Sequence, residues 1–158
     1  MRIRFALFAS ILLAVTAAFA QMPIPYGPPV SIDAAKKVAA AAIVEAEKNH
    51  WNMAIAIVDG GGNLVYFEKM NDTQIGSIQV SIDKAKAAAF FKRPTKAHQD
   101  ALATGGENLR ILKLSGAMPV EGGIPLVIDG KIVGAIGVSG GNSSQDGAVA
   151  GAGVIALK

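Results

Sequence analysis

The residues best suited to bind a metal ion are the two histidines of the chain, His50 and His98. A neutral imidazole nitrogen is a common metal ligand, so either histidine could take this role. Three methionines, Met53, Met70 and Met118, could add a soft axial ligand. Isolated histidines commonly face solvent and isolated methionines commonly fill a core, so both interpretations stay open. The sequence does not show whether the two histidines meet.

Tyr66 and Glu68 form a second candidate set, because residues two apart on a strand point to the same face. The pair could face a pocket, or it could belong to a half-exposed strand face. Glu68, Asp72 and Asp83 could bind iron at a surface, although scattered acidic residues are usually solvated.

Basic residues gather around the end of a predicted helix. They are Lys84, Lys86, Lys92, Arg93 and Lys96. This cluster could pair with the carboxylates of an anionic ligand such as haem. Cations near a helix C-terminus also complement the helix dipole, so the two interpretations are about equally supported.

Several kinds of chemistry have no support in the sequence. The chain has no cysteine, which excludes thiol catalysis and thiolate metal sites. No Walker loop is present, and Gly134, Gly137 and Gly140 do not have the spacing of a dinucleotide-binding fingerprint. The turn at Gly140 and Gly141 could hold an anion, but a simple strand-to-helix turn is the commoner case. No Ser–His–Asp set is recognisable, so no catalytic residue is assigned.

The first 20 residues have the features of a secretory signal peptide. Two arginines precede an apolar run, and the Ala18-Phe19-Ala20 pattern predicts cleavage after Ala20, which indicates a periplasmic or secreted protein. Without Arg2 and Arg4, 13 basic and 12 acidic residues remain, so the charge gives no argument for nucleic-acid binding. No later segment is expected to span a membrane. Residues 21–30 are rich in proline and predict an extended arm, either on a neighbouring subunit or as a loose tail.

The remaining residues, 31–158, are expected to form one α+β domain. Apolar periodicity, capping residues and turn residues predict an antiparallel sheet built from two hairpins, with helices packed on it. The predicted helices cover 31–49, 75–93, a short segment after a Thr95 cap, and a glycine-rich segment that Ser143 caps and that ends at Leu157. The predicted strands cover 51–59, 64–70, 124–128 and 131–139, and residues 107–121 are expected to form a loop with a short strand.

Three sequence stretches together resemble one known family. They are WNMAIAIVDGGGNLVYFEKMND, the helix from Lys84 to FFKRPT, and GGIPLVIDGKIVGAIGVSGGNSSQD. In this order they resemble the GlcG/HbpS family of haem-binding, proposed haem-degrading proteins, and the C-terminal domain of PduO-type proteins. The resemblance covers about Ser31 to Leu157. It implies a profilin-like or roadblock-like layout, haem as cofactor, homo-oligomers from dimers up to octamers, and in exported members a link to haem or iron sensing.

The residues and the resemblance together give a candidate haem site. Its cofactor-binding residues are His50, His98, Met70, Tyr66 and Lys84, with His50 or His98 as iron ligand. Asn63 stands where many relatives have a histidine, so a ligand in that turn is absent. The first hypothesis is an exported haem-binding protein that promotes oxidative haem degradation or senses haem or iron. The alternative is a non-enzymatic sensor or accessory module for another small ligand or a receptor partner.

Overall fold

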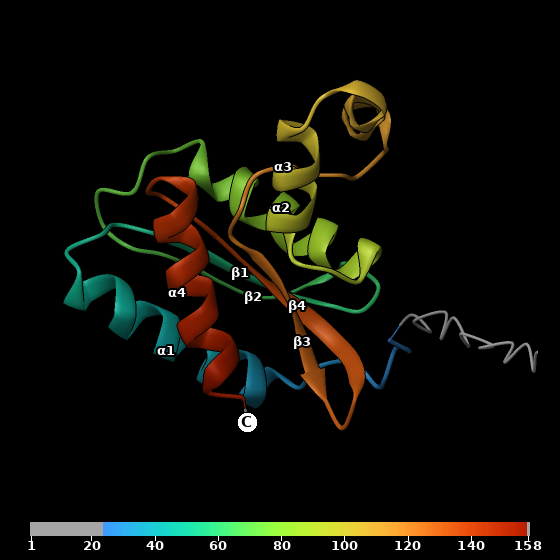
Figure 1. The fold of residues 1–158 in the computed structure, drawn as a ribbon. Coiled ribbons are helices and arrows are strands. Elements are labelled where there is room, and N and C mark those ends of the chain that lie inside the picture. The colour runs from blue at the N-terminus through green and yellow to red at the C-terminus, as the bar shows by residue number, and fades with distance from the viewer. Residues whose placement is uncertain (1–23, 158) are drawn as a thin grey trace, which may run out of the picture.

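The computed structural model describes residues 24–157 (Figure 1). Its helices are α1 (Ile32–Lys48), α2 (Ser77–Phe91), α3 (Thr95–Ala103), the 3₁₀ helix η1 (Gly106–Lys113) and α4 (Ser143–Ile155). Its strands are β1 (Ala54–Asp59), β2 (Leu64–Lys69), β3 (Gly123–Ile128) and β4 (Lys131–Ser139). The strands form one antiparallel sheet in the order β2-β1-β4-β3. The predicted α+β class and both predicted hairpins are confirmed.

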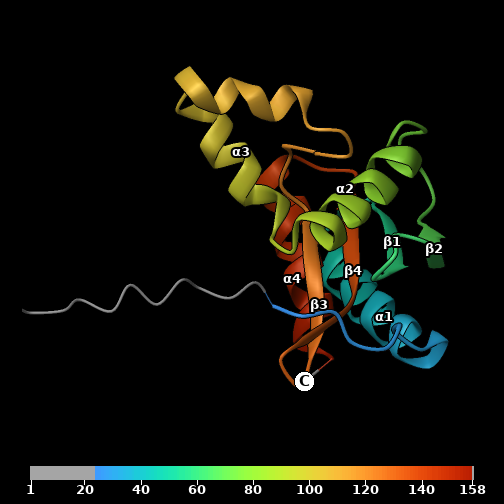
Figure 2. The ribbon, with the colours of Figure 1, turned by 90° about the vertical axis from the view of Figure 1, so that its right-hand side faces the viewer.

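Helices cover both faces of this sheet (Figures 1 and 2). Strand alternation divides the core between the two faces, because successive side chains point in opposite directions. Ile55 and Ile57 of β1 pack with α1 and α4, whereas Ala56 and Val58 pack with α2. The result is three layers, with the sheet between the α1–α4 pair and α2.

The proline-rich arm lies against its own domain. The Gly27 and Val30 amides donate to the carbonyls of Ile132 and Val133, each at 2.8 Å, and Ile132 donates back to Pro25 at 2.9 Å. Tyr26 also donates its hydroxyl hydrogen to the carbonyl of Ala89, near the end of α2, at 2.7 Å. Residues 25–30 therefore lie along the start of β4 and are held there by backbone hydrogen bonds. The predicted cleavage site lies outside the described residues.

Two local predictions were wrong. Residues 107–121 contain η1 and no strand, because glycines with positive φ at 105, 106 and 116 turn the chain at both ends of that helix. Thr95 does not cap α3, because its hydroxyl instead accepts a hydrogen bond from the Gly123 amide at 2.9 Å.

Two helix starts agree with the sequence to within one residue. The Ser31 side chain caps α1, as predicted. The capping box of α4 uses Asn142 and Gln145, one residue before the predicted pair of Ser143 and Asp146. None of the helices in the described part of the chain is long and apolar enough to cross a membrane.

Candidate functional site

The C-terminal end of α1, the loop after β2 and the N-terminal end of α4 lie on the left of Figure 1. Residues of these segments line a groove. Two adjoining cavities, which share Asn52 and Asp72 as lining residues, make up what we call the Asn52 groove. The first has a volume of about 320 Å³ and is also lined by His50, Trp51, Gln74, Gly140, Gly141 and Gln145. The second has a volume of about 400 Å³ and is also lined by Ile43, Glu47, Glu68, Lys69, Met70 and Asn71.

The end of α1 explains why the His50 side chain lies in this groove. The His50 amide donates to Glu47 at 3.0 Å and the Trp51 amide donates to Ala46 at 2.9 Å, which is the hydrogen-bond pattern of a Schellman motif. The motif needs a residue with positive φ, and His50 has φ 57° in the position where glycine is usual. A side chain in that conformation costs on the order of 1 kcal/mol.

A second left-handed residue, Asp72 with φ 61°, lines the same groove. Strained backbone conformations of this kind gather at ligand sites more often than elsewhere. Two of the four non-glycine residues with positive φ in the described chain therefore lie in one groove.

Two more candidates from the sequence, Met70 and Tyr66, lie on the same side of the sheet as His50. Both pack against the core beside α1, and Met70 lines the Asn52 groove. The Met70 sulfur accepts a hydrogen bond from the Met53 amide at 3.4 Å. Tyr66 donates to a Glu68 carboxylate oxygen at 2.8 Å, as expected for residues on one strand face, and this bond raises the pKa of Tyr66. Tyr66 itself does not line the groove, whereas its partner Glu68 does.

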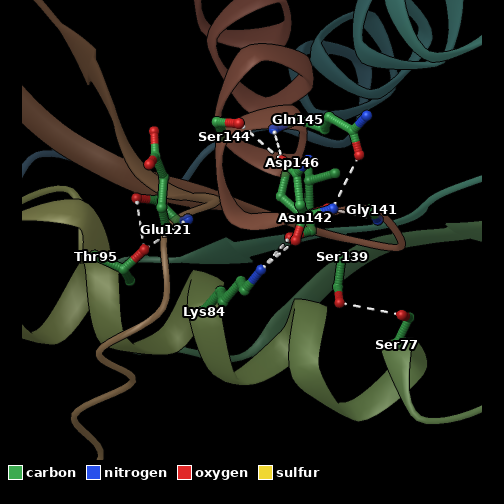
Figure 3. A network of polar contacts seen from close by, with 12 residues as sticks. Ser77, Lys84, Thr95, Glu121, Ser139, Gly141, Asn142, Ser144, Gln145 and Asp146 are labelled. Carbon is green, nitrogen blue, oxygen red and sulfur yellow. Dashed lines mark hydrogen bonds and ion pairs between the residues drawn. The ribbon is translucent and has the colours of Figure 1, made fainter. Parts of the chain in front are cut away.

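Lys84 differs from the surface cation that the sequence suggested. Its side chain is fully buried, and its Nζ donates to an Asp146 oxygen at 2.6 Å and to the Val138 carbonyl at 3.0 Å (Figure 3). Because both partners belong to the protein, the ammonium group offers nothing to a ligand in the groove. This pair could not be predicted from the sequence, because 62 residues separate its members.

His98 lies apart from His50. It belongs to α3, which follows α2 on the opposite side of the sheet, and only 6% of it is exposed. Its ring packs edge-on against Phe91 with 4.9 Å between ring centroids, and its Nδ1 has no hydrogen-bond partner within residues 24–157. Burial lowers the pKa of His98, and the nearby positive charge of Arg93 adds to this effect. The structure therefore does not bring the two histidines together in one site.

A site for a bare metal ion is not formed by residues 24–157, where no three His, Cys, Asp or Glu side chains converge. Haem is a different case, because its porphyrin supplies most of the iron ligands and the protein adds one or two. A single accessible imidazole such as His50 is sufficient for that role.

Comparison with known proteins agrees with the resemblance seen in the sequence. The chain is 37% identical to protein GlcG of Escherichia coli K12 over 105 residues, which are 66% of this chain and 77% of that one. The fold matches the crystal structure of HbpS with a TM-score of 0.76 and 28% identity, covering 84% of this chain and 92% of HbpS. It matches the crystal structure of a PduOC–haem complex with a TM-score of 0.73 and 25% identity, covering 81% and 94%. The sequence model of the family described as haem degrading protein HbpS-like matches residues 30–155, so the chain belongs to this HbpS-like family.

Proposed function

We propose that this chain binds haem in the Asn52 groove, with the His50 imidazole as iron ligand. The observation that carries the proposal is the exposed His50 ring, which the end of α1 holds at the mouth of a groove. Family membership and the haem complex of the structurally similar PduOC support haem as the ligand.

The lining of the groove is mostly polar, with a smaller apolar part. Trp51, Ile43 and Met70 supply apolar surface, and together the cavities fall in the volume range of small-molecule sites. Three carboxylates, those of Glu47, Glu68 and Asp72, also line the groove. The haem propionates would therefore lie away from these acids, toward Lys69, the amide side chains or solvent.

The chemistry of a loaded site would come from the cofactor, which supplies electron-transfer and oxygen chemistry when bound. The residues of the groove bind and orient the ligand, and no nucleophile–base pair is evident among them. We extend the proposal to oxidative haem degradation or to haem and iron sensing, which the description of the family supports. We place this function outside the cytoplasm, because the first 20 residues resemble a signal peptide. Assembly into dimers or larger homo-oligomers remains part of the proposal, and light scattering of the purified protein measures it.

A hemin titration of the chain beginning at Gln21 tests the proposal. The wild-type protein should give a saturable, shifted Soret band, and His50→Ala should weaken binding at least tenfold, about 1.4 kcal/mol, and change the band position. His98→Ala is the matched control and should bind like the wild type, because His98 lies on the other side of the sheet. A wild-type spectrum identical to that of free hemin would refute haem binding, and full binding by His50→Ala would refute the assignment of the ligand.

A second measurement separates a haem-degrading protein from a binder or sensor. Adding ascorbate and oxygen to the hemin complex should bleach the Soret band if the bound haem is degraded. A stable band under these conditions, with catalase present to remove free peroxide, would support the alternative of a non-enzymatic module.

A further inference from the structure

A buried ion pair lies next to Gly141, one of the residues that line the Asn52 groove (Figure 3). The Lys84 side chain of α2 is fully buried and the Asp146 side chain of α4 is 4% exposed. The two side chains come from helices on opposite faces of the sheet, and Lys84 also donates to the Val138 carbonyl of β4. The pair therefore ties both helix layers to one strand.

Stability alone is a weak reason for such a pair. Removing two charges from water has a large desolvation cost, and well-packed apolar residues of similar volume often stabilise a protein as well or better. Burial accordingly raises the pKa of Asp146, although Lys84 and the amides of Gly140 and Gly141 act in the opposite direction. Stabilisation of the fold alone therefore does not account for this ion pair.

The second oxygen of the Asp146 carboxylate contacts the backbone of the groove wall. While one Asp146 oxygen accepts from Lys84, the other accepts from the Gly141 amide at 3.0 Å. Gly140 and Gly141 line the Asn52 groove beside His50. The carboxylate therefore connects the buried lysine to the backbone of the groove wall.

This wall has little freedom to move toward Asn52 on its other side. A methyl group on Gly140 would overlap the Asn52 carbonyl oxygen and lie 2.9 Å from the Met53 Cα. The capping box of α4 holds the next residue, because the Asn142 amide donates to the Gln145 side chain at 2.9 Å. Loss of the contact to Asp146 would release the only side chain that holds the Gly141 amide among the described hydrogen bonds.

We propose that Lys84 and Asp146 are a positioning pair that fixes the Gly140–Gly141 wall and so sets the geometry of haem held by His50. This inference rests on the proposed haem site. Neither residue lines the groove, and the effect passes through the backbone of the wall, where Asp146 accepts from the Gly141 amide.

Two double variants test the proposal, since removing one partner alone would leave a buried charge and unfold the protein. Lys84→Gln with Asp146→Asn keeps an oxygen that can accept from Gly141, whereas Lys84→Met with Asp146→Leu removes it. The first should retain the wild-type hemin affinity and Soret position. The second should weaken hemin binding about tenfold and alter the spin state of the haem iron, because loss of a residue that supports a metal site commonly has such effects.

A matched control uses the exposed ion pair of Lys96 and Asp100 on α3, whose atoms lie 2.7 Å apart. Lys96→Met with Asp100→Leu should leave hemin affinity and spectrum unchanged. The proposal is overturned if the folded Lys84→Met, Asp146→Leu protein binds hemin with wild-type affinity and spectrum. Failure of wild-type binding would instead refute the haem site itself.

If the apolar double variant does not fold, hydrogen exchange of the wild-type protein decides the question. In the hemin-free protein the Gly141 amide should exchange slowly, because it donates to the Asp146 carboxylate that Lys84 holds. Rapid exchange at Gly141 in the folded, hemin-free protein would overturn the proposal, whether or not hemin binds.

Discussion

Gly137 in β4 lies directly beneath α2, and only a residue without a side chain fits there. A methyl group at this position would overlap the Ser81 carbonyl oxygen and lie 2.5 Å from the Ala85 amide nitrogen. Because both contacts are helix backbone, the helix would have to move away from the sheet. We expect Gly137→Ala to lower the free energy of unfolding by about 3 kcal/mol, measured by urea denaturation.

Gly151 in α4 is the matched control. Nothing lies within 4 Å of a methyl group built there, and alanine favours a helix interior over glycine by about 1 kcal/mol. Gly151→Ala should therefore stabilise the protein by about that amount. Equal stabilities for Gly137→Ala and the wild type would show that α2 is not held as close to β4 as the structure indicates.

The sequence predicted some site residues well and others poorly, for reasons specific to each residue. Tyr66 and Glu68 were placed together because strand periodicity is local. His50 was a candidate from its chemistry alone, whereas its exposure depends on a left-handed turn where glycine is expected. Lys84 was read as a surface cation because its partner Asp146 lies in a distant helix. Neither residue type nor spacing indicates which residues pair over such a distance in the sequence.

At the scale of the element, α3 carries a buried histidine whose protonation opposes folding. Burial and Arg93 lower the pKa of His98 in the folded protein, so the folded state binds this proton less tightly than the unfolded chain. The stability contributed by neutral His98 is therefore complete above the unfolded pKa of about 6.5 and is lost as the pH falls below it. Phe91, which packs on the ring, offers no acceptor for the added proton.

Urea denaturation between pH 7.5 and pH 5 measures this effect. The wild-type midpoint should fall with decreasing pH, and the fall should be smaller in His98→Gln, whatever the absolute stability of that variant. The same slope in His98→Gln as in the wild type would contradict a destabilising role for the protonated ring.

The segment after α3 shows why one element could not be predicted. A loop with a short strand was predicted for residues 107–121, yet Leu109, Leu112 and Leu114 of this segment are exposed in or beside η1. Apolar residues indicate a strand or helix only when they pack against a core, and this segment lies outside the sheet (Figure 2). The glycine turns at 105, 106 and 116 were the signal that the chain leaves the sheet there.

At the scale of the whole molecule, the prediction of the sheet depended on turn chemistry. The Asp129-Gly130 turn and the turn from Asp59 to Asn63 joined apolar runs into two hairpins, which the structure confirms. The sequence could not show that β1 and β4 pair in the centre, because hairpin signals are local and this pairing joins residues far apart.

The arm extends the cooperative unit of the molecule beyond the predicted start at residue 31. Val30 is 6% exposed and belongs to the main core, and residues 25–30 make three backbone hydrogen bonds with β4. At about 1 kcal/mol for each bond, a chain beginning at Ser31 should lose at least about 3 kcal/mol of unfolding free energy relative to one beginning at Gln21. Thermal and urea unfolding of the two chains measure the difference.

Tyr26→Phe in the longer chain separates the contribution of the Tyr26 hydroxyl to the unfolding free energy from that of the backbone contacts with β4. It removes only the hydroxyl that donates to Ala89 and keeps the aromatic ring, which lies 4.2 Å from the Lys92 ammonium group. We expect a loss of about 1 kcal/mol, smaller than that of the truncation, because the backbone bonds to β4 remain. If the truncated chain were as stable as the longer one, the arm would be an appendage and the domain would begin at α1. If truncation and Tyr26→Phe were equally destabilising, the side chain alone would fasten the arm, and its pairing with β4 would add no stability.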